Sequence, residues 1–387
     1  LPVGCLYGNY DGSLNNGSGM IYLRNRENAV LLEAKYSGDY PWPASADGAG
    51  HSLTLVKPDH GEGDIRAWAA SSKKGGTPGT PDWRQSRGYD GVVINEFVAH
   101  TDAPLEDSIE MFNSSTSSVN LSGCWISDDV DENKYRIPDG TILGARSFTN
   151  FTQSQYGFGL SMAGGVIGLV SSNNQVVIDA VKYAAQSNGA SCGRHPDGAE
   201  GFTTLASRTP GASNAVPWLG DIVINEIMYH PISGYDDDQY VELFNRGRGA
   251  VDVGYWRLMG GVDCIIPAGT MIASSNYLVI AENMTNLFAK YAQLNAGNTV
   301  GALQGHLSHF GERLVLSKPD NLAAPYQDYV IQDEVIYTDG WGLWTDGGGS
   351  SLELKDPHSD NRSAMNWADS DESQKAPWTA IDYTDSI

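Results

Sequence analysis

Carboxylates are the residues of this chain whose types and spacing could support chemistry. Glu96 and Glu110 recur as Glu226 and Glu242 in a second copy of the same sequence pattern. Each pair is expected on two adjacent strands, where two carboxylates could act as a general acid and a general base. Because the pair is duplicated together with its surroundings, we favour a structural role, in which the carboxylates accept hydrogen bonds from backbone N–H groups at one end of the fold.

Two acidic loops could bind calcium, which prefers several hard oxygen ligands. The candidate ligands are Asp128, Asp129 and Asp131 in the first loop and Asp236, Asp237 and Asp238 in the second. An EF-hand is excluded, because counting from Asp129 places Lys134 rather than glycine at position six and Gly140 rather than glutamate at position twelve. The second loop is the better candidate, since it lies between two repeated strands. A solvated acidic loop is the simpler alternative for both.

Histidine and tryptophan give weaker indications. The sequence contains no HExxH, GxSxG or phosphate-binding loop, so neither a zinc site nor a hydrolase site is predicted. His306 and His309 are three residues apart and lie near His230 only if the fold brings them together. An exposed platform that stacks on sugars is one interpretation of three tryptophans, and packing in a core or between modules is the favoured one. These tryptophans are Trp42, Trp341 and Trp344.

The four cysteines form no CxxC pair, which excludes a zinc ribbon and a thioredoxin-type motif. They are Cys5, Cys124, Cys192 and Cys264. Four cysteines in 387 residues are too few for a disulfide scaffold. A bond between Cys124 and Cys192 is one possibility, but small buried side chains are the simpler interpretation.

The composition excludes several classes of protein. The formal net charge is −23, and an acidic surface repels phosphate, so we expect no nucleic-acid partner. No apolar run approaches the 18 residues of a membrane span. Residues 1–5 lack the basic stretch and apolar core of a signal peptide. We therefore expect either that the mature protein has lost such a peptide or that the chain is a piece of a longer one.

Internal repeats define the organisation of the chain. Residues 91–97 match 221–227, residues 108–113 match 240–245, and residues 137–141 match 266–270, with offsets of 129 to 132. Trp125 matches Trp256 within the same series, so we expect both tryptophans at equivalent buried positions. Four landmarks in one order indicate two copies of a domain.

A third, partial copy occupies the start of the chain. Eleven residues between Trp42 and Ser71 recur at a constant offset of 299, from Trp341 to Ser370. Residues 12–82 therefore resemble the second half of the copy that begins near residue 219. With Pro-Gly exits near 77–81 and 209–214, we expect three units: 1–85 as the C-terminal half of a module, 88–215 as a full module, and 219–385 as a full module with the start of a further segment.

Short strand-like runs separated by Gly, Asn, Asp and Pro clusters predict the fold class. They are typical of antiparallel sandwiches, and we expect strands at residues 92–97, 108–112, 165–170, 175–183, 240–244, 277–281, 313–316 and 351–354. One helix is predicted at residues 286–294, capped by Thr285 or Asn286. Because strands and helices do not alternate, a doubly wound sheet is excluded.

The motifs together resemble one known family. The run from Val223 to His230, the Glu-Leu-Phe-Asn strand that ends at Asn245, the following tryptophan and the Ile-Pro-Ala-Gly-Thr segment are similar to the bacterial branch of lamin tail domains. The resemblance covers most of the chain and implies tandem immunoglobulin-like β-sandwich modules, with the first module incomplete. It also implies a place in large secreted or cell-surface proteins, beside kinase, phosphoesterase or carbohydrate-binding domains.

The sequence thus predicts a non-catalytic structural or adhesive segment of an extracellular assembly. Its expected partners are protein, either other modules or copies of the parent chain. The alternative is a module that binds calcium or carbohydrate and serves an attached enzyme. Apart from Ca²⁺, no cofactor is expected.

Overall fold

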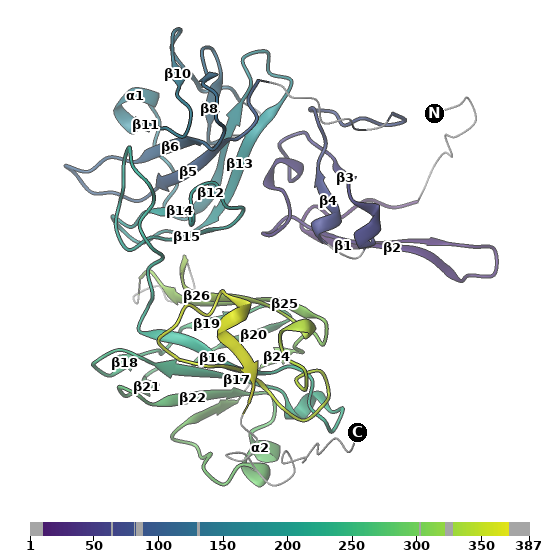
Figure 1. Cartoon of the computed structure of the whole chain (residues 1–387). Helices are drawn as coiled ribbons and strands as arrows, with labels where there is room; N and C mark the ends of the chain where they lie inside the picture. Colours follow the sequence, from purple (N-terminus) through teal and green to yellow (C-terminus); the bar gives the residue numbers. More distant parts are fainter. Residues whose placement is uncertain are drawn as a thin grey trace. The chain divides into compact units, whose positions relative to one another are not determined.

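Antiparallel strands make up most of the structure. The computed structural model describes residues 11–62, 65–80, 82, 88–129, 132–301, 303–321 and 328–370. It divides into two compact units, Leu1–Trp218 and Leu219–Ile387, whose sheets are seen in Figure 1. The predicted all-β class is confirmed. The division expected near residues 82–90 falls within the first unit and stays a prediction.

Residues 88–218 form a sandwich of two sheets, which we call the first complete module. One sheet has the strand order β11-β6-β5-β14-β15 and the other has the order β13-β12-β8-β9, while β7 and β10 form a short ribbon. The elements are β5 (Val92–Val98), β6 (Ser108–Asn113), β7 (Val119–Asn120), β8 (Trp125–Ser127), β9 (Tyr135–Arg136), β10 (Ile142–Leu143), β11 (Phe148–Thr152), α1 (Gln153–Tyr156), β12 (Gly164–Val170), β13 (Val177–Ala184), β14 (Cys192–Arg194) and β15 (Phe202–Thr204).

Residues 219–370 repeat this topology as the second complete module. Its sheets have the orders β23-β22-β17-β16-β27-β28 and β24-β20-β19-β25-β26, and β18 pairs with β21. The strands are β16 (Ile222–Met228), β17 (Tyr240–Asn245), β18 (Val251–Asp252), β19 (Arg257–Met259), β20 (Val262–Ile265), β21 (Met271–Ile272), β22 (Tyr277–Ala281), β23 (Thr299–Gly301), β24 (Gln304–Gly305), β25 (Gly311–Pro319), β26 (Tyr329–Thr338), β27 (Leu352–Leu354) and β28 (Trp367–Asp369). The helices are α2 (Met284–Lys290) and the 3₁₀ turns η4 (Asp236–Asp238), η5 (Asp339–Trp341) and η6 (Ala364–Asn366).

Each complete module has its own apolar core between its two sheets. In the first module, Ile94 and Met111 from one sheet pack in one cluster with Ile167 and Leu169 from the other. The second module has the same arrangement around β16, β17, β19 and β25. Alternate residues of each strand point inward, and burying them supplies most of the stabilising free energy.

A β-bulge interrupts the same strand in both modules. In β5 the register shifts between Ile94 and Glu96, and in β16 it shifts between Ile224 and Glu226. The extra residue at each bulge is the asparagine of the Asn-Glu motif, Asn95 or Asn225. A bulge leaves a backbone group without its ladder partner, and a buried unpaired group costs about 1–3 kcal/mol.

A half-buried aspartate from the opposite sheet satisfies this backbone group. Asp179 of β13 accepts the Ile94 N–H at 2.8 Å, and Asp333 of β26 accepts the Ile224 N–H at 2.7 Å. Sequence reasoning missed both residues. An aspartate inside a strand rich in valine and isoleucine in each copy was the available signal. We call this contact the bulge clamp.

The predicted equivalence of Trp125 and Trp256 is wrong by one residue. Ile126 of β8 pairs with Leu169, and Leu258 of β19 pairs with Leu316, so the true offset there is 132. Trp256, 9% exposed, therefore takes the position of Cys124 in the core. Trp125 lies half-buried on the outer face of its sheet, because a one-residue shift along a strand moves a side chain to the other face.

The start of the chain forms two separate two-stranded sheets within the first unit. β1 (Ser18–Arg24) pairs with β2 (Val30–Ser37), and β3 (Leu53–Leu55) pairs with β4 (Trp68–Ala70). The 3₁₀ turns η1 (Ala44–Ala46), η2 (Pro58–His60) and η3 (Ile65–Ala67) lie around the second pair. We call residues 18–80 the half-module.

Hydrogen bonds attach the half-module to β13. The Val177 N–H donates to His51 Nε2 at 2.9 Å, while His51 Nδ1 lies 2.6 Å from the Ser71 carbonyl oxygen. Lys182 Nζ lies 2.9 Å from an Asp47 carboxylate oxygen. Since Nε2 accepts a backbone proton, His51 is neutral here with its own proton on Nδ1.

Local predictions hold best for strands. All eight predicted strands coincide with observed ones. The helix begins earlier than predicted, at Met284, because Asn283 accepts the N–H groups of Thr285 and Asn286 and caps it.

Cys124 and Cys264 are buried free thiols, so Cys124 is not paired with Cys192. Cys5 and the segment after residue 370 lie outside the described residues. No helix in the described ranges is long and apolar enough to cross a membrane.

Trp256→Ala should destabilise the protein more than Trp125→Ala. We expect a loss of about 3–5 kcal/mol for Trp256, the cost of a large cavity in a core. For Trp125 we expect about 1–2 kcal/mol, because a half-buried ring loses less transfer free energy. Urea denaturation of both variants measures the difference, and equal losses would contradict the one-residue shift.

Candidate functional site

The carboxylate pair of the first complete module lies at the centre of the five-stranded sheet. Glu96 and Glu110 stand directly opposite each other on β5 and β6. Glu96 accepts the Thr209 N–H at 3.1 Å and the Thr209 hydroxyl at 2.8 Å. Glu110 accepts the Gly211 N–H at 2.5 Å. The pair therefore holds the Thr-Pro-Gly exit loop of its own module, and the expectation that it accepts backbone N–H groups is confirmed.

The second pair has the same register but different donors. Glu226 and Glu242 are opposite each other on β16 and β17. Glu226 Oε1 accepts the Tyr240 hydroxyl at 2.6 Å and the hydroxyl of Ser351. Glu242 Oε1 accepts the side-chain amide of Asn225 at 3.0 Å. The donors here are the side chains of Asn225, Tyr240 and Ser351, whereas two of the three donors in the first module are backbone N–H groups.

Burial restricts what these carboxylates can do chemically. Glu96, Glu110 and Glu226 are all buried, and they accept hydrogen bonds from groups of the protein itself. A general acid or base must reach the proton that it transfers. The paired glutamates are thus arranged as structural carboxylates, whose hydrogen bonds hold neighbouring segments of the module together.

Burial also changes the acidity of Glu110. Desolvation raises its pKa to about 7, and the nearby negative charges of Glu96 and Asp197 act in the same direction. The Gly211 N–H opposes this shift, because it stabilises the ionised form. One carboxylate oxygen of Glu110, Oε1, is buried without a hydrogen-bond partner.

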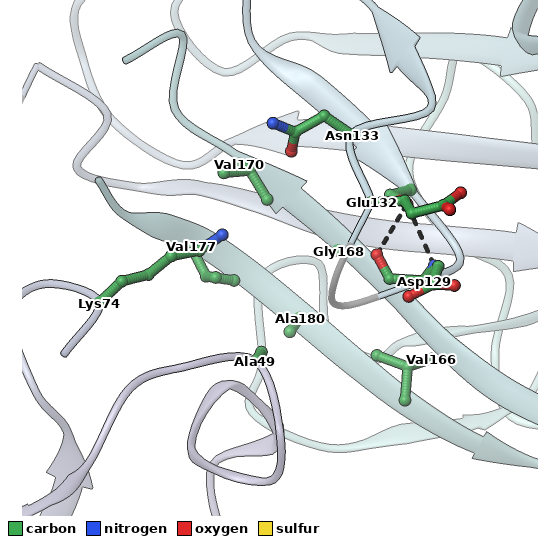
Figure 2. Close-up of a pocket in the computed structure, with 11 residues that line it drawn as sticks. Ala49, Lys74, Asp129, Glu132, Asn133, Val166, Gly168, Val170, Val177 and Ala180 are labelled. Carbon is green, nitrogen blue, oxygen red and sulfur yellow. Dashed lines mark hydrogen bonds between the residues drawn. The ribbon is translucent and has the colours of Figure 1, made fainter. Parts of the chain in front are cut away.

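The first acidic loop lies beside a crevice where the half-module meets β12 and β13. Figure 2 shows Asp129 and Glu132 on one side of it and Lys74 and Ala49 of the half-module on another. The crevice has an interior volume of about 10 Å³, the space for one water molecule. Asp128 forms an ion pair with Lys134 at 2.6 Å. Asp131 lies outside the described residues.

The three aspartates of the second loop form the turn η4, and each has a different partner. Asp238 is buried, accepts the Ser233 hydroxyl at 2.5 Å and forms an ion pair with Lys290. Asp237 accepts the Asn283 side-chain amide at 3.1 Å. Asp236 lies 3.5 Å from His309.

Convergence of several acidic oxygens on one point is what calcium requires. Within the described ranges, no group of three or more His, Cys, Asp or Glu side chains is arranged to hold a metal ion. Calcium binding by either loop stays a prediction.

The fold does bring the scattered histidines together. The rings of His230 and His309 stack with centroids 3.9 Å apart. His230 Nδ1 lies 2.5 Å from Asp346, and His306 Nδ1 lies 3.1 Å from Glu282. These side chains form a half-exposed cluster at one end of the second module, and only the folding of distant loops assembles it.

The three tryptophans have different surroundings, each within its own unit. Trp341 packs against the core of the second module and its ring centroid lies 6.1 Å from that of Trp367. Trp42 makes the matching contact with Trp68 at 6.4 Å in the half-module. Trp344 is 37% exposed. Core packing, which belongs to the favoured interpretation, is confirmed for Trp341.

Comparison with known proteins gives one family. A family model described as Lamin Tail Domain matches residues 85–189 and 217–367. No curated protein matches the chain. Among solved structures, a protein of the DUF4876 family from Bacteroides thetaiotaomicron is 11% identical, with 72% of this chain and 92% of that chain covered and a TM-score of 0.25.

Glu110 should make the first module less stable as the pH rises from about 4 to about 7. Its folded pKa lies above the unfolded value of about 4.3, so its contribution is fully present below pH 4 and is lost as the pH rises through 7. The loss is on the order of 3 kcal/mol. Glu110→Gln removes this dependence, so variant and wild type should diverge in urea titrations between pH 4 and 8. A constant difference would contradict the raised pKa.

Proposed function

The chain belongs to the lamin tail domain family, and on that premise we propose that it is a non-catalytic structural segment of a large secreted or cell-surface protein. One observation carries the proposal. The paired carboxylates are the groups best placed for acid–base chemistry, and they are bonded to the protein's own exit loop and neighbouring strands. Three of the four, Glu96, Glu110 and Glu226, are also buried, and burial keeps them from the proton of an external substrate.

Charge and module structure support the proposed setting. A net charge of −23 favours solubility and disfavours binding to nucleic acid. Each complete module has a separate core, as expected of independent units in series. We propose other modules, or copies of the parent chain, as partners in an extracellular assembly with a spacing or adhesive role.

Binding of calcium or carbohydrate in service of an attached enzyme is the second candidate. Asp236 and Asp237 favour calcium, because they are adjacent on η4 and Asp236 is 41% exposed. Lys290 works against it, because its ammonium group already neutralises Asp238. The exposed ring of Trp344 is the feature that favours carbohydrate.

Stretching single molecules of the full chain tests the structural proposal. Each complete module should unfold in one cooperative step, because its two sheets share one core. At about 3.3–3.6 Å per extended residue, residues 88–218 and 219–370 should release roughly 430–470 Å and 500–550 Å. Glu96→Gln should lower the force of the shorter step only. Smooth extension without steps would contradict a spacing or adhesive role.

Calcium titration separates the two candidates. If the chain is structural, millimolar Ca²⁺ should leave the melting temperature of the second module unchanged, because no ligand binds the folded state preferentially. Asp237→Asn is the matched variant and should behave identically. A saturable rise in melting temperature that Asp237→Asn abolishes would establish the calcium alternative instead.

A further inference from the structure

The half-module reproduces the second half of a complete module, residue pair by residue pair. Ile21 pairs with Ala34 on β1 and β2, as Ile167 pairs with Val181 and Leu314 with Val335. In all three hairpins the register shifts at the same point, directly after the leucines Leu23, Leu169 and Leu316. Such agreement identifies β1 and β2 as the counterparts of β12 and β13, and of β25 and β26.

The short sheet of the half-module follows the same rule. Leu55 pairs with Trp68 as Leu354 pairs with Trp367. The Ser52 N–H donates to Ser71 Oγ at 3.0 Å, and the Ser351 N–H donates to Ser370 Oγ at 3.1 Å. β3 and β4 are therefore the counterparts of β27 and β28.

Core positions of the half-module face solvent. Ile21 is 43% exposed and Leu23 is 56% exposed, whereas their counterparts in both complete modules are 0% exposed. Those four counterparts are Ile167, Leu169, Leu314 and Leu316. In the complete modules the strands of the first half cover this face, and the described part of the half-module has no such strands.

Two strand edges are open for the same reason. The counterparts of β1 pair on their other side with β8 or β19, and the counterparts of β3 pair with the Asn-Glu strand, β5 or β16. In the described residues, β1 and β3 each have one partner strand. Exposed edges with apolar side chains readily accept a further strand.

A single hydroxyl shows which strand is missing. Ser351 is buried and donates to Glu226 of the Asn-Glu strand. Its counterpart Ser52 is exposed. An incoming Asn-Glu strand would bring a glutamate to this hydroxyl.

We propose that the half-module is a docking surface for the first half of a lamin tail module that lies outside the two complete modules of this chain. The inference rests on the architecture proposed above. The occupant is defined by the chain's own complete modules: an Asn-Glu strand that adds to β3, and a strand like β19 that adds to β1 and covers Ile21 and Leu23. A second copy of this chain is a poor occupant, because its first halves are already buried in its own modules.

The half-module differs from the complete modules in having no aspartate at the clamp position, and this determines which contacts can hold the incoming strand. Leu32 pairs with Leu23 at the position where Asp179 pairs with Leu169 and Asp333 with Leu316. The incoming strand would therefore lack the bulge clamp. Edge hydrogen bonds and apolar contact hold it.

The register gives a direct test. Ser18 corresponds to Gly311, so a chain in which a second copy of residues 219–310 replaces residues 1–17 joins the missing half at its natural connection. In this chain, hydrogen exchange at the amides of β1 and β3 should slow on the order of 100-fold relative to the original chain, because frayed edges become paired. Binding of a hydrophobic dye should fall.

Two matched controls block the docking at opposite sides. Ile227→Pro in the added copy removes an N–H from the strand that would pair with β3. Leu23→Lys in the half-module places a charge on the face to be covered, at a position exposed in the original chain. Each should return the exchange of β1 to its original rate.

Every outcome decides the proposal. Unchanged exchange in the extended chain overturns it, as does protection that survives both controls. Slow exchange in the original chain together with concentration-dependent dimerisation would assign the face to a second copy and also overturns it. The stepwise unfolding of the complete modules is independent of these results, so failure here is distinguishable from failure of the structural proposal.

Discussion

A backbone N–H that the β-ladder leaves unpaired is the constraint on which each complete module depends. The bulge at the Asn-Glu motif directs the N–H of Ile94 or Ile224 away from its own sheet, and Asp179 or Asp333 accepts it from the opposite sheet. Burial makes this contact costly for the ionised carboxylate. Desolvation raises the pKa of Asp179 and raises that of Asp333 to about 7. The free-energy cost of desolvating the aspartate is tolerated because leaving the backbone N–H of the bulge unpaired would be no more favourable. The contact also fixes how the two sheets face each other.

The two modules complete the clamp with different residues. In the first, the Arg194 side chain donates to the Ile94 carbonyl at 2.7 Å and to Asp179 at 2.9 Å. In the second, the Asn361 side chain donates to the Ile224 carbonyl at 3.3 Å and to Asp333 at 2.7 Å. Arginine comes from β14, whereas asparagine comes from the loop before β28. The geometry at the bulge is therefore maintained although the donor changes in both identity and position. The paired glutamates vary in the same way, with two backbone N–H groups and the Thr209 hydroxyl as donors in the first module and hydroxyl and amide side chains in the second.

The half-module shows which features of the fold form when the first half of a module does not cover the second half. Its hairpin keeps the register and the bulge of the complete modules, so these features are local. Ile21 and Leu23 stay exposed and its sheets stay two-stranded, so the sandwich itself depends on contacts between halves. Because hairpins alone are only marginally stable, the bonds of His51 to Val177 and of Asp47 to Lys182, both on β13, supply part of the support that a first half would give.

The sequence by itself determined the fold class, the repeats and the positions of the strands, because alternation of apolar residues and turn chemistry are local properties. It also placed the paired glutamates on adjacent strands, since the duplication fixed their spacing. Only the tertiary structure decided which face Trp125 and Trp256 occupy, because an offset of one residue in a repeat reverses a strand's faces. It alone identified Asp179 and Asp333, and it alone stacked His230 on His309. These depend on which distant segments meet, and that is settled by the packing of one sheet on the other.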